Sequence, residues 1–331
     1  MKFTHFSFYE NLPDENEDIC EENLKLFFKT MFERQEVWYN RFILKKDRPW
    51  TTDSILDRNK FTNVYRELDR SSQFQIKNVF KGKFSNVSDL LWKVMFYRVF
   101  NSPDFFTWLE NQDKFYDGMI PKRKEYKSDE FLDLMHDYRK TGGNPFTNAY
   151  LINSQACPGK TRDFCYAKKV IPTLQEEFNK LLITIKKAKT PEEIIKKLKT
   201  LPAVSDFIAH EFYQDLSYGP RYSNVNLMNF NQDDFTNVGP GAAIGIRLIF
   251  PSLKNQKDGI YYLRDLAPSE LKSIGNFKFL NYDGTKYYTD NKPNITLHQI
   301  EMWLCEFQKY WKMKIGKGKQ RSQFQPKTKT L

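Results

Sequence analysis

Residues 238–250, VGPGAAIGIRLIF, constrain the fold more than any other stretch of this sequence. Two glycines flank a proline there, and an apolar segment rich in small side chains follows at once. Proline suits the first position of a helix, because the N–H that it lacks would have no partner there. The small residues Ala242, Ala243 and Gly245 let a second helix approach closely. The stretch therefore predicts a tight corner followed by a closely packed helix over about 240–250.

The same pattern is typical of a helix-hairpin-helix turn, which binds DNA through its backbone. N–H groups at the start of the helix point outward, and the helix dipole favours an anion at that end. We therefore expect Gly239, Gly241 and Ala242 to bind DNA phosphate, with Arg247 as a charged contact on the same helix. An ordinary tight turn between helices has this pattern too and stays open as the alternative.

Most of the remaining chain predicts α-helix. A stripe of apolar residues near the N-terminus has the 3,4 spacing of a buried helix face, and it consists of Leu24, Phe27, Phe28 and Met31. Thr52 or Asp53 can cap the next helix. Thr296 and Gln299 form the capping box of a final helix. Residues 258–290 are rich in Gly, Tyr and Asp and predict irregular structure, with a hairpin around Asp283-Gly284.

These patterns predict a mainly α fold in which residues 1–313 form a single helical unit. A division into 1–140 and 141–313 stays open. Residues 314–331 carry six basic side chains, no acidic ones and little apolar content, so we expect a disordered basic tail.

The charge of the chain favours a polyanionic partner. Its 52 Lys and Arg residues exceed its 41 Asp and Glu residues, which gives a net charge of +11. Counterion release makes nucleic acid the first candidate, although an AT-rich genome would also inflate the lysine content. No apolar stretch is long enough to span a bilayer, and the N-terminus lacks the apolar run of a signal peptide. We expect a cytoplasmic protein, nuclear in a eukaryote, with no membrane contact.

The cysteines do not predict a metal site or a disulfide framework. The four cysteines are scattered along the chain, at Cys20, Cys157, Cys165 and Cys305. Neither their spacing nor that of the four histidines forms a CxxC or HxxxH set. The sequence also contains no GxxxxGK[ST] phosphate loop. We therefore expect no metal and no cofactor.

Four longer motifs resemble one protein family. They are ERQEVWYNRF with RPWTTDSILDRNKFTNVYRELDR (33–70), HEFYQDLSY (210–218), DDFTNVGPGAAIGI (233–246) and ITLHQIEMWLCEFQKY (295–310). They resemble the helical domain linked to 5-hydroxymethyluracil DNA kinases and to the alpha-glutamyl/putrescinyl-thymine pyrophosphorylases. The resemblance implies a helix-hairpin-helix DNA glycosylase-like fold and work on hypermodified pyrimidines, notably in phage DNA. The chain departs from the family at His298, where an acidic residue is usual, and over 251–294, where the match is weak.

Three carboxylates are candidates for catalysis. Cleavage of a base from deoxyribose passes through an oxocarbenium-like state, which a carboxylate beneath the sugar stabilises. Asp215 lies among bulky apolar residues, Asp234 lies just before the hairpin, and Glu301 lies on the final helix. A surface charge at Asp215, a helix cap at Asp234 and a structural salt bridge at Glu301 stay open as alternatives. Cys305, one turn after Glu301, is better interpreted as a small buried side chain than as a nucleophile.

A second group of residues is predicted to contact DNA or the base. Helical 3,4 spacing would place Asn63, Arg66, Asp69 and Arg70 on one polar face. We expect Arg66 and Arg70 to bind DNA, and Asn63, Asp69, Trp50 and Lys309 to line the base pocket. An ordinary solvated face is the alternative.

The sequence thus predicts an enzyme on double-stranded DNA that carries modified bases. We expect a DNA glycosylase-like protein that flips out a 5-hydroxymethyl-derived pyrimidine, glucosylated or not, and hydrolyses its glycosidic bond, in phage defence. No lysine follows in the helix after the hairpin, so excision would be monofunctional. A transferase that displaces pyrophosphate from activated 5-hydroxymethyluracil to attach an amine or amino acid is the first alternative. A noncatalytic DNA-binding module is the second, and protein partners are unknown.

Overall fold

The computed structural model describes residues 18–81, 84, 86–112, 119–147, 156–282, 287–290 and 293–318. The turn expected at Asp283-Gly284 and most of the basic tail, 319–331, lie outside these residues. The described chain is mainly helical, which confirms the predicted fold class. None of the described helices is long and apolar enough to cross a membrane.

The chain forms two compact units. Unit 1 combines the two ends of the sequence, Met1–Arg66 and Thr236–Leu331, and unit 2 is the continuous segment Glu67–Phe235. The boundaries therefore do not fall at residue 140, where the sequence left a division open. Local patterns along the sequence cannot reveal a unit whose two parts lie 169 residues apart, because its defining contacts are long-range.

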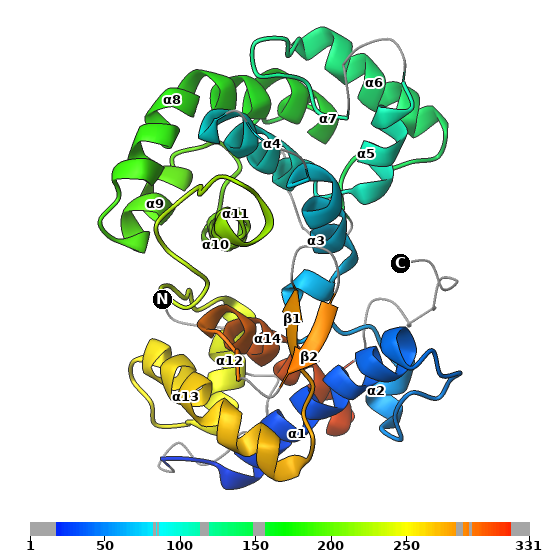
Figure 1. The fold of residues 1–331 in the computed structure, drawn as a ribbon, viewed down its shortest axis with the longest axis vertical. Coiled ribbons are helices and arrows are strands. Elements are labelled where there is room, and N and C mark those ends of the chain that lie inside the picture. Colours follow the sequence, from blue (N-terminus) through cyan, green and yellow to red (C-terminus); the bar gives the residue numbers. More distant parts are fainter. Residues whose placement is uncertain are drawn as a thin grey trace. The chain divides into compact units, whose positions relative to one another are not determined.

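Unit 1 is built from helices and one small hairpin (Figure 1). Its elements are α1 (Glu21–Trp38) with a π-helical continuation (Tyr39–Ile43), α2 (Ser54–Arg58), α12 (Pro240–Ile249), α13 (Gln256–Ile274), β1 (Phe279–Tyr282), β2 (Tyr287–Asp290) and α14 (Leu297–Lys314). The two strands pair antiparallel, with Phe279 opposite Asp290.

The first and last helices of unit 1 pack against each other. The four apolar residues of the predicted stripe on α1 are all buried, which confirms that prediction. Phe27 meets Phe307 of α14 edge to face, with ring centroids 5.5 Å apart. The indole N–H of Trp303 donates to the carbonyl oxygen of Phe27 at 3.2 Å. The apolar faces of the two chain ends therefore complete one core.

The predicted caps are confirmed. The Asp53 side chain accepts hydrogen bonds from the N–H groups of Ile55 and Leu56 and begins α2. Thr296 and Gln299 form the capping box of α14. These local signals hold because each satisfies backbone donors that a helix start leaves open.

The irregular structure predicted for 258–290 is wrong in its first half, which belongs to α13. The buried residues on this helix include Ile260, Leu263, Ala267 and Leu271, whose spacing is that of one helix face. Burial of this apolar face outweighs the unfavourable helix propensities of Gly259 and of Pro268 inside the helix.

Unit 2 is entirely helical among its described residues, apart from connecting segments (Figure 1). Its helices are α3 (Arg70–Phe74), α4 (Val87–Phe100), α5 (Pro103–Glu110), α6 (Ser128–Lys140), α7 (Arg162–Cys165), α8 (Ile171–Lys187), α9 (Pro191–Leu198), α10 (Asp206–Ser217) and α11 (Gly219–Tyr222). Π-helical turns occupy Gln75–Val79 and Tyr166–Val170. Aromatic rings of α4 and α5 dominate the core, and Phe96, for example, meets Phe106 edge to face at 6.2 Å.

A buried ion cluster joins α4 to α10 within unit 2. Arg98 is 2% exposed, and two guanidinium N–H groups donate to the two carboxylate oxygens of Asp215, which is 0% exposed. Arg98 also donates to Glu211 Oε2 at 2.9 Å, and Gln75 Nε2 donates to Asp215 Oδ2 at 2.8 Å. Charges removed from water need such partners, because an unpaired buried charge is strongly destabilising.

We expect the Asp215→Ala substitution to destabilise unit 2 by about 3–5 kcal/mol, since it leaves the Arg98 charge buried without its bidentate partner. Asp104→Ala is the matched control, because Asp104 pairs with Arg70 at the surface and its loss costs less than about 1 kcal/mol. Urea unfolding followed by circular dichroism measures both free energies. Equal destabilisation by the two substitutions would contradict a structural role for the buried cluster.

Candidate functional site

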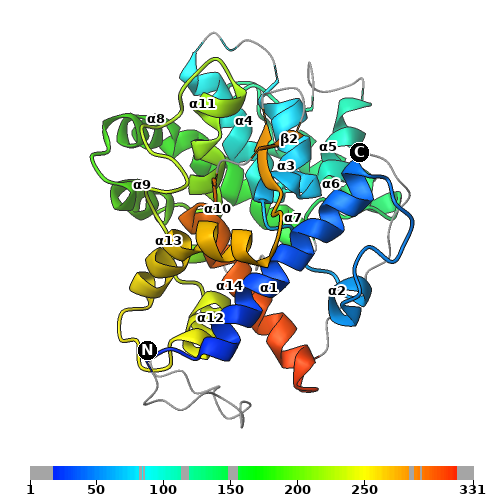
Figure 2. The same cartoon turned by 60° about the horizontal axis from the view of Figure 1, so that its bottom comes forward.

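The corner predicted around residues 238–250 is a close contact between α12 and α14, which lie side by side in both views (Figures 1 and 2). A Cβ atom on Gly245 would lie 2.6 Å from the carbonyl oxygen of Leu304, and one on Gly241 would lie 3.0 Å from the sulfur of Cys305. Glycine is therefore required where the two helices approach each other, which confirms the predicted close packing.

The start of α12 is held by a carboxylate from α14. Gly239 is the N-terminal capping residue of α12, and its N–H donates to Glu301 Oε1 at 3.1 Å. Glu301 is 4% exposed, so this contact is largely shielded from water. A negative charge is favourable at this end of a helix. Glu301 thus holds the turn before α12, called the hairpin from here on, against α14.

Cys305 lies one helical turn beyond Glu301 and belongs to the same cluster. Its sulfur is 3.9 Å from Glu301 Oε1, and the backbone of Ala242 lies beside the thiol. Burial raises the pKa of the Cys305 thiol well above its ordinary value, and the nearby Glu301 and Glu306 charges raise the pKa further. A thiol held protonated is a poor nucleophile, which agrees with the interpretation of Cys305 as a packing residue.

The predicted DNA contacts of the hairpin residues stay a prediction. The N–H of Gly239, which we expected to bind a DNA phosphate, donates to Glu301 of α14, and the backbone of Ala242 lies beside the Cys305 thiol. Arg247, at the far end of α12, is half-buried and lines a surface pocket.

The three candidate carboxylates occupy very different environments. Glu301 belongs to unit 1, whereas Asp215 and Asp234 belong to unit 2. Burial raises the pKa of the Asp215 carboxyl, against the opposing effects of Arg98 and Gln75, and its oxygens are enclosed by those two side chains. Asp234 is exposed and accepts a hydrogen bond from the N–H of Asn231 at 2.7 Å.

Arg98, which determines the environment of Asp215, was missed in the sequence. An arginine within the apolar run 90–100 was the signal that could have pointed to a buried ion pair. The two residues are 117 positions apart, so no local pattern connects them.

The single polar face predicted from Asn63 to Arg70 is not formed. Residues 60–63 have no helical structure, Arg66–Leu68 is a short 3-10 turn, and Asp69 is extended at the start of α3. Asn63 accepts a hydrogen bond from Arg34 at 2.7 Å, and Arg66 is 7% exposed. Arg70 forms a bidentate pair with Asp104. The 3,4 spacing was misleading because the chain from Asn63 to Asp69 is not α-helical.

The last two base-pocket candidates lie at the surface of unit 1. Trp50 is half-buried between cations, with the guanidinium of Arg41 5.0 Å from its ring and that of Arg48 5.8 Å away. Its indole N–H donates to the carbonyl oxygen of Lys46 at 2.8 Å. Lys309 donates to the buried Glu306 at 2.7 Å and keeps 46% of its side chain exposed. Trp50 therefore belongs to a basic, aromatic surface segment.

Comparison with known proteins gives two related findings. Residues 21–320 match the family described as the helical domain of 5-hmdU DNA kinase. A curated protein of Bacillus phage SP10, named 5-hmdU DNA kinase, is 28% identical over 321 residues, which cover 92% of this chain and 48% of that protein. The chain thus spans about half the length of this curated relative. No solved structure matches.

The close contact at the helix corner can be tested by Gly245→Ala, because helix propensity and the steric contact predict opposite changes in stability. Helix propensity alone would make Gly245→Ala stabilising by about 1 kcal/mol. We expect it to destabilise unit 1 by about 1–3 kcal/mol instead, because the added methyl group meets the Leu304 carbonyl. Chemical unfolding of the variant and the parent protein measures the difference. A gain in stability would show that the corner is looser than described.

The Glu301 contact can be tested through Cys305. Glu301→Gln keeps an acceptor for the Gly239 N–H but removes a charge that raises the thiol pKa, so we expect iodoacetamide to alkylate Cys305 several-fold faster at about pH 9. Peptide mass spectrometry distinguishes Cys305 from the other three cysteines. Glu22→Gln, at an exposed site on α1, is the control and should leave the rate unchanged. If Glu301→Gln leaves the alkylation rate unchanged, the Glu301 charge does not raise the pKa of the Cys305 thiol.

Proposed function

This chain belongs to the family of the 5-hmdU DNA kinase helical domain, and from that premise we propose that it binds DNA carrying 5-(hydroxymethyl)-2′-deoxyuridine or a derivative. We assign to it the recognition of the modified base for group transfer at the 5-hydroxymethyl position. The observation that carries the proposal is the match over residues 21–320, which includes all of unit 2, most of unit 1 and the α12–α14 corner.

The charge of the chain supports a DNA partner. Its net charge of +11 favours binding to phosphates, and the relative from Bacillus phage SP10 is named for a reaction on DNA. The sequence contains no GxxxxGK[ST] loop, and the match covers 48% of that relative. We therefore propose that this chain recognises the modified base and that a further component supplies the transferred group.

The environments of the carboxylates support chemistry that leaves the glycosidic bond intact. Hydrolysis needs a carboxylate that can reach the sugar. The Asp215 carboxylate is enclosed by Arg98 and Gln75, and one Glu301 oxygen is engaged by the Gly239 N–H. Group transfer to the exocyclic hydroxymethyl group requires neither residue to act on the sugar.

Base excision is the second candidate, and one observation favours it. Asp234 is exposed four residues before Val238, so its carboxylate is accessible in unit 2. The expected monofunctional glycosylase would rest on this residue. Its expected role in phage defence stays a prediction.

Binding to matched duplexes tests the proposal. We expect the protein to prefer a duplex with one 5-(hydroxymethyl)-2′-deoxyuridine over the same duplex with thymidine by about 5- to 150-fold, the discrimination that one well-formed pair of base contacts supplies. Fluorescence anisotropy at fixed salt measures both dissociation constants. Equal affinities would remove base recognition from the proposal.

Nucleoside analysis of the same incubations separates transfer from excision. With the protein alone we expect intact modified nucleoside and no free base after digestion and mass spectrometry. Release of free base that is abolished by Asp234→Asn would establish excision in its place. The Glu22→Gln variant is the control, because its substitution lies on the exposed face of α1.

A further inference from the structure

A surface pocket of about 610 Å³ lies beside the corner in unit 1. It is formed by the end of α12, the connection to α13 and the first turn of α13, together with Val238 of the hairpin. Its volume is within the range of about 300–1,000 Å³ that is usual for ligand sites. The pocket thus has room for a ligand and touches the hairpin directly.

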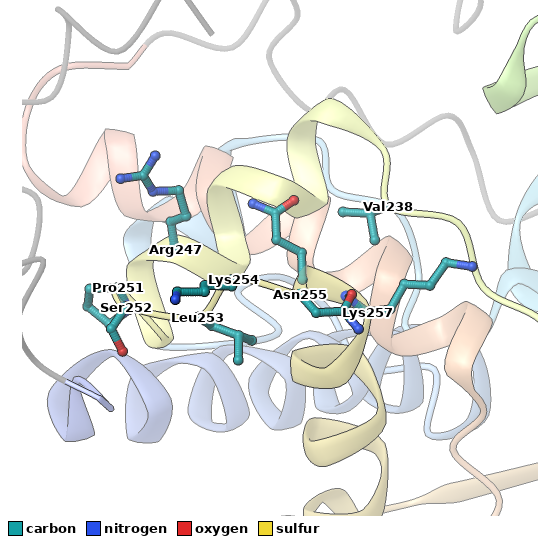
Figure 3. A pocket seen from close by; sticks show the side chains of 9 residues that line it. Val238, Arg247, Pro251, Ser252, Leu253, Lys254, Asn255 and Lys257 are labelled. Carbon is teal, nitrogen blue, oxygen red and sulfur yellow. The ribbon is translucent and has the colours of Figure 1, made fainter. Parts of the chain in front are cut away.

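The lining of this pocket is cationic. Arg247, Lys254 and Lys257 line it, and its nine lining residues, all of them described, include no Asp or Glu. Figure 3 shows Arg247 and Lys257 on opposite sides of the view, with Lys254 between them. Three positive charges around one hollow favour a ligand that carries several negative charges.

The polar residues of the lining provide hydrogen-bonding groups as well as charge. Ser252 and Asn255 are exposed there, and Asn255 caps the start of α13 through the N–H of Lys257. Among the described residues, two carboxylates bond to the lining: Asp18 accepts from Ser252 at 3.2 Å, and Asp258 accepts from Asn255 at 2.8 Å. They engage those side chains, and the three cations still outnumber them.

We propose that this pocket is a phosphate-binding site in which Arg247, Lys254 and Lys257 hold phosphate groups. The chemistry fits each cation: the guanidinium of Arg247 can bind two phosphate oxygens, and the two ammonium groups add compact point charges. Where the phosphates belong to a DNA strand, the inference rests on the proposed function. Where they belong to free phosphate or diphosphate, it does not.

Continuity with the hairpin favours the backbone of bound DNA as the source. Val238 joins the pocket to the Gly239 cap, whose N–H is engaged by Glu301. The pocket therefore provides cationic side chains for phosphate beside a turn in which at least one backbone N–H, that of Gly239, already donates to a carboxylate. Such contacts position a strand without reading its sequence.

The Lys254→Gln/Lys257→Gln double variant tests the site. If both lysines contact DNA phosphates, the slope of log affinity against log salt falls by about 1.8, and affinity at about 0.1 M salt falls between about 10- and 60-fold. The loss should be equal for modified and unmodified duplexes, because phosphate contacts carry no base information. Lys272→Gln, exposed in the last turn of α13 outside the lining, is the control for lost charge.

Calorimetry with inorganic phosphate and pyrophosphate distinguishes the source. Pyrophosphate binding that is lost in the double variant, with DNA affinity unchanged, assigns the pocket to a free phosphate compound. Unchanged binding of DNA, phosphate and pyrophosphate overturns the proposal, and unchanged thermal unfolding of the variant excludes misfolding. One further outcome is that the parent protein binds modified and unmodified duplexes equally while the double variant binds both more weakly. That result contradicts base recognition and supports phosphate binding in the pocket.

Discussion

The approach of α12 to α14 determines the geometry of unit 1, because the Leu304 carbonyl lies where any side chain at residue 245 would have to be. This contact brings Glu301 to the Gly239 N–H and the Cys305 thiol beside the backbone of Ala242. The cationic pocket lies at the other end of α12, beside Arg247. One steric requirement at a glycine therefore positions the hairpin and the carboxylate that binds it.

Two buried carboxylates, Asp215 and Glu301, are compensated in different ways. In unit 2, Arg98 and Asp215 neutralise each other inside the core, so that the pair links α4 and α10. In unit 1, the Glu301 carboxylate meets the start of a helix, where backbone donors and the helix dipole compensate the charge. Both carboxylates thus have a structural role that explains their burial without catalysis.

Sequence patterns predicted those features that depend on neighbouring residues. The buried stripe of α1, the Asp53 cap and the Thr296 capping box each involve residues within one or two helical turns. The helix α13 was missed because its glycine, tyrosines and proline indicate irregular structure, whereas its buried face stabilises a helix. The environment of Asp215 could not be predicted, because it depends on a partner 117 residues away. The position of Glu301 on the final helix was predicted. Its hydrogen bond with Gly239 could not be predicted, because it depends on how α12 and α14 pack.

The composition of unit 1 from both ends of the chain has a consequence for biosynthesis. Phe27 of α1 packs against Phe307 of α14, so the N-terminal helix emerges from the ribosome long before its partner exists. Unit 2 is continuous and can fold as soon as residue 235 is free, in keeping with the tendency of domains to fold as units during synthesis. The apolar face of α1 must therefore stay without its partner through the synthesis of the whole inserted segment, until α14 has been translated.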